Sequence, residues 1–236
     1  MTPAILVTLL ALAAYVAGSI PFGFLIAKWW RGVDLRTLGS RNIGATNTGR
    51  VLGKSWGALC LLLDLLKGLL PTLLLPRLVE LPAGWIGPTA VACGTAAILG
   101  HVFPVWLGFR GGKGVATGAG VAMVLSLPAG IAALAAFAIA FAIKRTVSLA
   151  SIAAAVVYAV AVLAMNRDFR DESHWPLLAF AIAIPTLIIV RHRENIVRLL
   201  RGQEQRYLGG TDNISPNSAS GSDLNDTQPG KSQSTL

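Results

Sequence analysis

Six long apolar runs, almost free of charged side chains, limit what this sequence can fold into. They cover residues 4–27, 55–75, 85–103, 114–143, 147–165 and 175–190. Such runs are typical of transmembrane helices, because a bilayer interior accepts few charges and requires backbone hydrogen bonds to be made within the segment. Only 13% of the residues are charged, about half the fraction found in soluble domains. The sequence therefore predicts an all-α integral membrane protein.

The apolar run at residues 114–143 is too long for one straight crossing. As a helix it would extend for about 45 Å, against a hydrocarbon core of about 30 Å. Pro128 and Gly130 lie near its middle, where a turn would divide it into two helices. With that division every strongly basic loop falls on one face, as the positive-inside rule requires. We therefore predict seven transmembrane helices, with the N-terminus outside and the C-terminus in the cytoplasm.

The net charge of +9 is concentrated in the short loops between the apolar runs. This distribution indicates membrane topology, and no nucleic-acid partner is expected. The first run lacks a preceding basic segment and continues to Ile26, so we interpret it as a retained helix rather than a signal peptide. Residues 1–206 are expected to form the membrane domain, and residues 207–236 a disordered polar cytoplasmic tail.

The first basic loop contains GSRNIGATNTGRVLGK, residues 39–54, in which glycines alternate with polar side chains. Glycine allows successive backbone N–H groups to converge on an anion. Ser40, Thr46 and Asn47 would add neutral donors, and Arg50 adds a planar guanidinium that matches phosphate oxygens. The simpler interpretation is a flexible, positively charged connector, but the density of specific polar residues favours a phosphate site.

A second glycine-rich segment, GFRGGKGVATG at residues 108–118, leads into a helix. Its glycines surround a lysine, in the order Gly111, Gly112, Lys113 and Gly114. The Walker A motif is absent, because Leu107 and Gly114 stand where that motif needs Gly and Ser or Thr, so ATP hydrolysis is not expected. Free N–H groups at a helix start, together with Lys113, still suit a phosphate. Two such loops on one face predict phosphorylated substrates.

Two further segments on this face add candidate catalytic side chains. Ser148 begins a helix after Lys144–Arg145, where capping alone would account for it. His192 and Asn195 lie three residues apart after the last apolar run and would share one side of an amphipathic surface helix. Only convergence with the glycine-rich loops makes these three residues candidates for catalysis.

Asp64 and Lys67 place two charges one helical turn apart inside the second apolar run. Charges within a bilayer are costly and are either paired or functional. We predict a structural ion pair in the interior of the bundle that supports the loops. Catalysis by Asp64 is the alternative.

Taken together, these motifs resemble those of one enzyme family. GSRNIGATNTGR, GHVFPVWLGFRGGKGVAT and HRENIVRLLRGQE are similar to the three signature segments of the acyl-phosphate-dependent glycerol-3-phosphate acyltransferases, the PlsY type of bacterial membrane enzyme. The resemblance covers residues 1–206 and includes GSIPFGFLIAK and LDLLKG. It implies transfer of a fatty acyl chain from acyl phosphate to the 1-hydroxyl of glycerol 3-phosphate. The products are lysophosphatidic acid and inorganic phosphate, in the first acylation of bacterial phospholipid synthesis.

The resemblance also implies roles for individual residues. We assign catalysis to His192, Asn195 and Ser148. Substrate phosphate binding is assigned to Ser40, Thr46, Arg50, Gly111, Gly112, Lys113 and Gly114. The proton acceptor for the 1-hydroxyl is either His192 or a substrate phosphate.

The resemblance further implies a location and partners. No metal and no cofactor are expected, and the location is the bacterial cytoplasmic (inner) membrane. The expected partners are acyl phosphate, glycerol 3-phosphate and membrane lipid, with a functional link to an enzyme that produces acyl phosphate.

A transporter of phosphate or a phosphorylated metabolite is the alternative from another functional class. Transporters bind their substrates near the bilayer midplane, whereas the polar motifs here gather on one face. Glycerolipid acyltransferases that use a His and an Asp with four residues between them are excluded, because no histidine in the chain has an Asp at that spacing.

Overall fold

The computed structural model describes residues 2–167 and 171–207, and all regular secondary structure in these ranges is helical. Residues 208–236, predicted to belong to a disordered tail, lie outside the described residues. The α-helices are α1 (Pro3–Ser19), α2 (Phe22–Arg31), α3 (Ala45–Leu52), α4 (Lys54–Leu74), α5 (Ile86–Val102), α6 (Val115–Leu125), α7 (Leu127–Lys144), α8 (Val147–Met165), α9 (Trp175–Arg191) and α10 (Arg193–Leu200). Short 3₁₀ helices are η1 (Leu75–Arg77), η2 (Val105–Leu107) and η3 (Glu172–His174).

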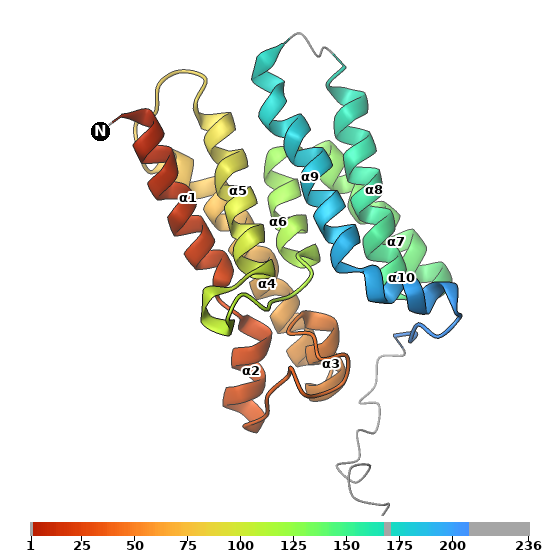
Figure 1. Cartoon of the computed structure of the whole chain (residues 1–236). Coiled ribbons are helices and arrows are strands. Elements are labelled where there is room, and N and C mark those ends of the chain that lie inside the picture. The colour runs from red at the N-terminus through yellow and green to blue at the C-terminus, as the bar shows by residue number, and fades with distance from the viewer. Residues whose placement is uncertain (1, 168–170, 208–236) are drawn as a thin grey trace, which may run out of the picture.

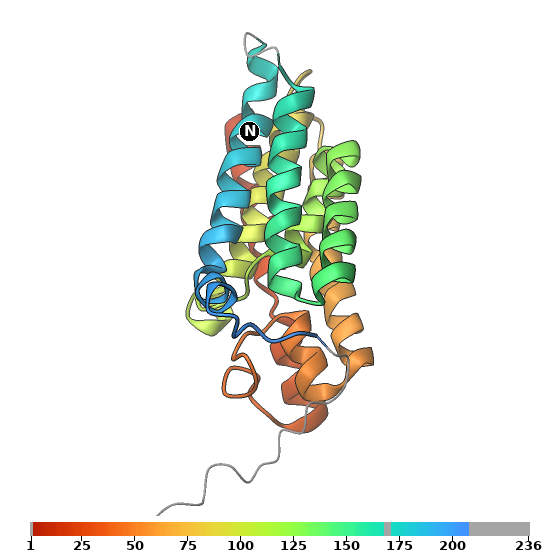
Figure 2. The same cartoon turned by 90° about the vertical axis from the view of Figure 1, so that its right-hand side faces the viewer.

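Six helical spans in the described ranges are long and apolar enough to cross a membrane. They are Pro3–Arg31, Lys54–Arg77, Ile86–Leu107, Leu127–Lys144, Val147–Met165 and Glu172–Arg191. The apolar helix α6 has only 11 residues and is therefore about 17 Å long. Figures 1 and 2 show the long helices side by side in one bundle. This architecture agrees with the predicted all-α membrane protein.

The long run at 114–143 is divided into α6 and α7, as predicted, but at a different residue. The chain turns at Ser126, whose backbone is extended (φ −153°, ψ 91°), and Pro128 lies in the first turn of α7. Proline suits that position because the first helical N–H groups have no partner within the helix. Gly130 serves packing instead: a Cβ there would lie 2.8 Å from Met123 Sδ.

The first apolar run, expected to form one helix, is broken between α1 and α2. Ile20 and Pro21 separate the two helices, and proline cannot donate the hydrogen bond that a continuous helix needs. The freed carbonyl of Ile20 accepts a hydrogen bond from Lys67 Nζ at 2.7 Å. A charge in α4 therefore stabilises the break.

Glycines bring two helix pairs into very close contact. A Cβ on Gly18 of α1 would lie 2.1 Å from the Ala97 carbonyl oxygen of α5. A Cβ on Gly68 of α4 would lie 2.2 Å from the Thr117 carbonyl oxygen of α6. Small residues allow such approach between helices in a membrane, where dispersion contacts drive association. The Gly68 contact fixes α6 against α4 near the start of α6.

The two ends of the bundle differ in chemistry. Figure 1 shows α2, α3 and α10 at the end opposite the N-terminus, where the glycine-rich segment also lies. We call this the basic end. It gathers segments 32–44, 108–114, 145–146 and 201–207, which come from distant parts of the sequence.

Candidate active site

A polar cavity of about 590 Å³ opens at the basic end. Its walls come from both glycine-rich loops, from the start of α8 and from α10. The predicted site residues that line it are Ser40, Thr46, Arg50, Gly111, Lys113, Gly114, Ser148, His192 and Asn195. The convergence expected from the sequence is therefore present in the structure.

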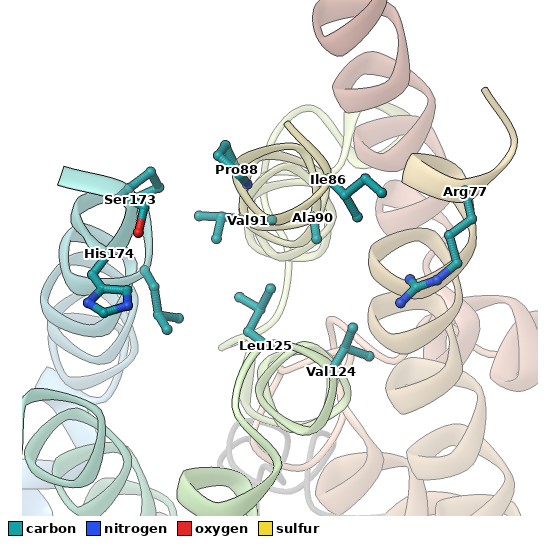
Figure 3. Close-up of a pocket in the computed structure, with 12 residues that line it drawn as sticks. Arg77, Ile86, Pro88, Ala90, Val91, Val124, Leu125, Ser173 and His174 are labelled. Atoms are coloured by element: carbon teal, nitrogen blue, oxygen red, sulfur yellow. The ribbon is translucent and has the colours of Figure 1, made fainter. Parts of the chain in front are cut away.

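A second, smaller cavity lies elsewhere in the bundle, between the ends of α5, α6 and α9. It has a volume of about 250 Å³ and is lined mainly by apolar side chains such as Val91 and Leu125. Figure 3 shows Arg77 on one side of α5 and Ser173 and His174 on the other. None of the predicted site residues lines it. The polar cavity is accordingly the candidate active site.

The glycine-rich segment supplies free backbone N–H groups from its second half. Gly111 N donates to Val102 O and Gly112 N donates to His101 O, both at 3.1 Å, so these two groups are already used. Within the described ranges, the N–H groups of residues 113–117 make no hydrogen bond. Gly114 has φ 83° and turns the chain into α6. Five consecutive donors and a helix N-terminus thus suit an anion.

Gly112, predicted to bind phosphate, does not line the cavity. It is buried behind the wall, against the ring of His101, and a Cβ there would lie 2.1 Å from His101 Nε2. Its small size holds the loop close to α5. Gly111 and Gly114 do line the cavity.

Lys113 lines the cavity as a partly buried, positively charged side chain. Its ammonium donates a hydrogen bond to Asn195 Oδ1. Burial lowers the pKa of Lys113 to about 8, because removal from water disfavours the charged form. The side chain therefore remains mostly protonated at pH 7 and can receive a phosphate.

Glu204 links the catalytic candidates, although no role was predicted for it. Its Oε1 accepts hydrogen bonds from Ser148 Oγ at 2.7 Å and from Asn195 Nδ2 at 2.5 Å, and its Oε2 accepts one from Arg198 Nε at 2.7 Å. Burial raises the pKa of Glu204, but the three hydrogen bonds outweigh this effect and hold the pKa below its ordinary value. The sequence did offer one signal for Glu204, because this acidic residue ends the otherwise basic segment HRENIVRLLRGQE.

His192 is held as a neutral imidazole. Its Nδ1 lies 2.8 Å from the carbonyl oxygen of Ile188. A carbonyl only accepts hydrogen bonds, so Nδ1 carries the hydrogen and Nε2 is left as an acceptor. Burial lowers the pKa of His192 to about 4. The residue can therefore accept a hydrogen bond from a substrate hydroxyl at neutral pH.

The first glycine-rich loop is organised by Asn47, which was expected to donate to substrate. Its buried amide instead donates to the carbonyl oxygens of Leu35, Leu38 and Asn42, and its Oδ1 accepts from Ser40 N at 2.8 Å. Asn47 therefore shapes the loop. In the described part of the chain, the side chains of Ser40, Thr46 and Arg50 make no hydrogen bond and remain available.

Asp64 and Lys67, predicted to form a structural pair, are in contact. The carboxylate and the ammonium are 2.8 Å apart and almost fully buried. His101 Nδ1 lies 3.7 Å from the same carboxylate oxygen, and both Asp64 and His101 reach the wall of the cavity. No feature of the sequence indicated His101 beyond its place in the second motif.

Comparison with known proteins identifies the family. Residues 8–202 match the family described as Glycerol-3-phosphate acyltransferase. A glycerol-3-phosphate acyltransferase of Anaeromyxobacter sp. (strain K) is 46% identical over 207 residues, 87% of this chain and 100% of that protein. The enzyme of that name from Myxococcus xanthus (strain DK1622) is 48% identical over 199 residues, 84% of this chain and 98% of that protein.

Solved structures give the same result. The crystal structure of PlsY, described as an integral membrane glycerol 3-phosphate acyltransferase in its glycerol 3-phosphate form, has a TM-score of 0.76 and 42% identity, covering 85% of this chain and 94% of that one. A PlsY structure in the lysophosphatidic acid form has a TM-score of 0.74 and 40% identity, covering 87% and 96%. Over most of its length, the chain therefore belongs to the PlsY family of glycerol-3-phosphate acyltransferases.

Proposed function

We propose that this protein transfers a fatty acyl chain from acyl phosphate to the 1-hydroxyl of glycerol 3-phosphate. The products are lysophosphatidic acid and inorganic phosphate. The main observation in support is the polar cavity, which is lined by Arg50 and by residues 113–116, whose N–H groups make no hydrogen bond within the described ranges. Both substrates carry a phosphate, and this cavity offers cationic groups from two separate loops.

The chemistry needs little beyond positioning and charge stabilisation. Acyl phosphate is a mixed anhydride, so its carbonyl carbon is already activated and inorganic phosphate is a good leaving group. The 1-hydroxyl oxygen forms the new ester bond to this carbon, and the bond from the carbon to the phosphate oxygen breaks. The substrate hydroxyl loses its proton during this step. Lys113 and the helix N-terminus would stabilise the negative charge that develops.

His192 is proposed to orient the hydroxyl rather than to keep its proton. A base with a pKa of about 4 holds a proton weakly at neutral pH, whereas a phosphate monoester has its second pKa near 6. A substrate phosphate is therefore the better final acceptor, with Nε2 of His192 aligning the hydroxyl. We expect His192→Ala to lower kcat by about 10²-fold. Near-normal turnover of this variant would show that neither role is required.

The acyl chain is proposed to leave the cavity toward lipid between α4 and α7. Leu61 of α4 and Phe137 of α7 line the cavity next to its polar walls. Leu61 is half exposed. A chain placed there would keep its carbonyl carbon near Lys113 while its methylene groups remain in an apolar environment.

We also propose seven crossings, an outside N-terminus and a cytoplasmic basic end in the bacterial inner membrane. The N-terminus and α10 lie at opposite ends of the bundle (Figure 1), as an odd number of crossings requires. The concentration of Lys and Arg at the basic end supports its cytoplasmic location. An enzyme that produces acyl phosphate would be the functional partner.

The deciding experiment uses purified protein in detergent with palmitoyl phosphate and glycerol 3-phosphate. Phosphate release and lysophosphatidic acid formation are monitored, with palmitoyl-CoA as the alternative donor and Lys113→Ala as the control. We expect product from acyl phosphate alone, lost in Lys113→Ala. Product from palmitoyl-CoA would contradict the proposed donor. No product from either donor, with uptake of unchanged glycerol 3-phosphate into vesicles, would favour transport.

A further inference from the structure

Arg191, the last residue of α9, contacts the glycine-rich segment rather than an acidic partner. Its Nη2 donates to Gly111 O at 3.2 Å and to Gly112 O at 3.3 Å. Its guanidinium carbon lies 5.9 Å from the centre of the Phe103 ring, next to the end of α5. No ion pair of Arg191 with Asp or Glu occurs within the described ranges. Nη2 is therefore bonded to the loop, while Nε is buried without a hydrogen-bond partner in the described ranges and Arg191 also lines the polar cavity.

The same two glycines are held from another side by α5. Their N–H groups donate to the carbonyl oxygens of Val102 and His101. The His101 ring lies against Gly112, and Asp64 lies 3.7 Å from that ring. Carbonyl and N–H groups of the Gly111–Gly112 peptide are thus both bonded. Arg191 supplies the only charge-assisted contacts to this peptide pair in the described part of the chain.

Anchoring of the two glycines also orients the residues that come after them. In a trans peptide the carbonyl and the next N–H point in opposite directions, so anchoring Gly112 O sets the direction of the Lys113 N–H. That group is the first of the five free donors, and the position of the Lys113 backbone also limits where its ammonium can reach. We propose that Arg191 is a positioning residue that presents the N–H groups of residues 113–117 and Lys113 to the substrate phosphate. This proposal rests on the proposed function.

Amide hydrogen exchange of the substrate-free protein provides the first test. Arg191→Gln should speed exchange in the peptide covering residues 108–118, because Gly111 and Gly112 lose the contacts that hold their carbonyls. Exchange in α1 and α8 should stay unchanged. Arg201→Gln is the matched control, since Arg201 is an exposed arginine at the same end and does not line the cavity. Wild-type exchange in residues 108–118 of Arg191→Gln would overturn the proposal.

Kinetics provide the second test. Loss of a charge-assisted hydrogen-bonded anchor should raise KM for a phosphate-bearing substrate, and the inhibition constant of inorganic phosphate, by about tenfold or more. We expect kcat to fall less, and Arg191→Lys, which keeps the charge without the planar fork, to lie between wild type and Arg191→Gln. A raised KM with unchanged exchange would indicate direct substrate contact and contradict a positioning role. A lowered melting temperature with unchanged KM would show a merely structural role and also contradict it.

A second variant disturbs the loop without touching Arg191. Gly112→Ala places a Cβ 2.1 Å from His101 Nε2 and must displace the segment. We expect the same faster exchange in residues 108–118 and the same rise in the phosphate inhibition constant. Normal phosphate inhibition with a displaced segment would overturn the proposal. Failure of wild-type protein to form product would refute the proposed function, while the exchange result would still decide whether Arg191 holds the loop.

Discussion

At the scale of single residues, Lys113 couples phosphate binding to pH. Burial lowers its pKa to about 8, so raising the pH through this value removes the charge that a phosphate would contact. We expect kcat/KM to fall above about pH 8. Bound phosphate stabilises the ammonium and so raises the pKa of Lys113. The alkaline decrease in kcat should therefore occur at higher pH than that in kcat/KM. Rates between pH 6 and 10, corrected for spontaneous hydrolysis of acyl phosphate, test this.

Lys113→Arg is the matched variant for that prediction. The guanidinium stays charged across this pH range, so the alkaline decrease should disappear even if the overall rate is lower. If the decrease in kcat/KM above about pH 8 persisted unchanged in Lys113→Arg, the ionisation would belong to another group.

Residue types and the family resemblance together predicted most of the residues that line the candidate site. Nine of the ten residues predicted for catalysis or phosphate binding line the cavity, because glycine, hydroxyl and cationic side chains on one face are rarely needed for packing alone. Asn47 and Gly112 differ for a shared reason. Whether a donor is free for substrate depends on its bonds within the loop, and a sequence does not show that Asn47 is already bonded to three carbonyls.

At the scale of elements, the position of α6 depends on its contact with α4 at Gly68. Gly68→Ala would place a Cβ 2.2 Å from Thr117 O in the first turn of α6. We expect a loss of about 1–3 kcal/mol in unfolding free energy, from overpacking, together with lower activity because the free N–H groups move. Gly87→Ala in α5, where nothing lies within 4 Å of a new Cβ, is the control and should be neutral. Equal melting temperatures and rates for the two variants would contradict this role.

The segment after α10 is held to the bundle by Glu204 and Tyr207. Tyr207 N donates to Arg145 O at 2.7 Å, and Glu204 bonds Ser148, Asn195 and Arg198. Because the pKa of Glu204 is lowered in the folded state, its ionised form stabilises that state above the ordinary value of 4.5, and this contribution is lost as the pH falls through the folded pKa.

Thermal unfolding at several pH values tests the role of Glu204. The wild-type melting temperature should fall more steeply below about pH 5 than that of Glu204→Gln, which cannot ionise. The other carboxylates are common to both proteins and cancel in the comparison. Parallel pH dependence in the two proteins would indicate that folding does not lower the pKa of Glu204.

Helix boundaries were predicted less well than helix existence. The length of the run at 114–143 required a break, but proline is tolerated in a first helical turn, so the turn fell at Ser126 before Pro128. The break at Ile20–Pro21 was missed because apolar residues continue on both sides of it. Its stability depends on Lys67, 47 residues away, and local patterns do not report such a contact.

At the scale of the whole molecule, the fold brings together loops that are far apart in the sequence. Segments around Ser40, Lys113, Ser148 and His192 all lie at one end because successive helices alternate in direction (Figure 1). The distribution of charge predicted this clustering before any contact was known. It did not predict the closeness of α1 to α5 or of α4 to α6, which depends on individual glycines. Topology was therefore easier to predict from the sequence than packing was.

The orientation in the membrane gives a prediction for the intact protein. Native Cys60 and Cys93 are fully buried, so single cysteines can be added to the parent chain and treated with a membrane-impermeant maleimide. Seven crossings place Ala83→Cys and Ser126→Cys outside and Thr37→Cys in the cytoplasm. The first two should react in intact cells, and the third only after permeabilisation. The difference in labelling between each denatured variant and the denatured parent, in which Cys60 and Cys93 also react, provides the reference for complete reaction of the added cysteine. If α6 and α7 formed one crossing, Ser126→Cys would stay unreactive in both intact and permeabilised cells while Ala83→Cys still reacted, because residue 126 would then lie at membrane depth. That result would leave six crossings, with the N-terminus and α10 on the same face and segments 108–114 and 145–146 on opposite faces.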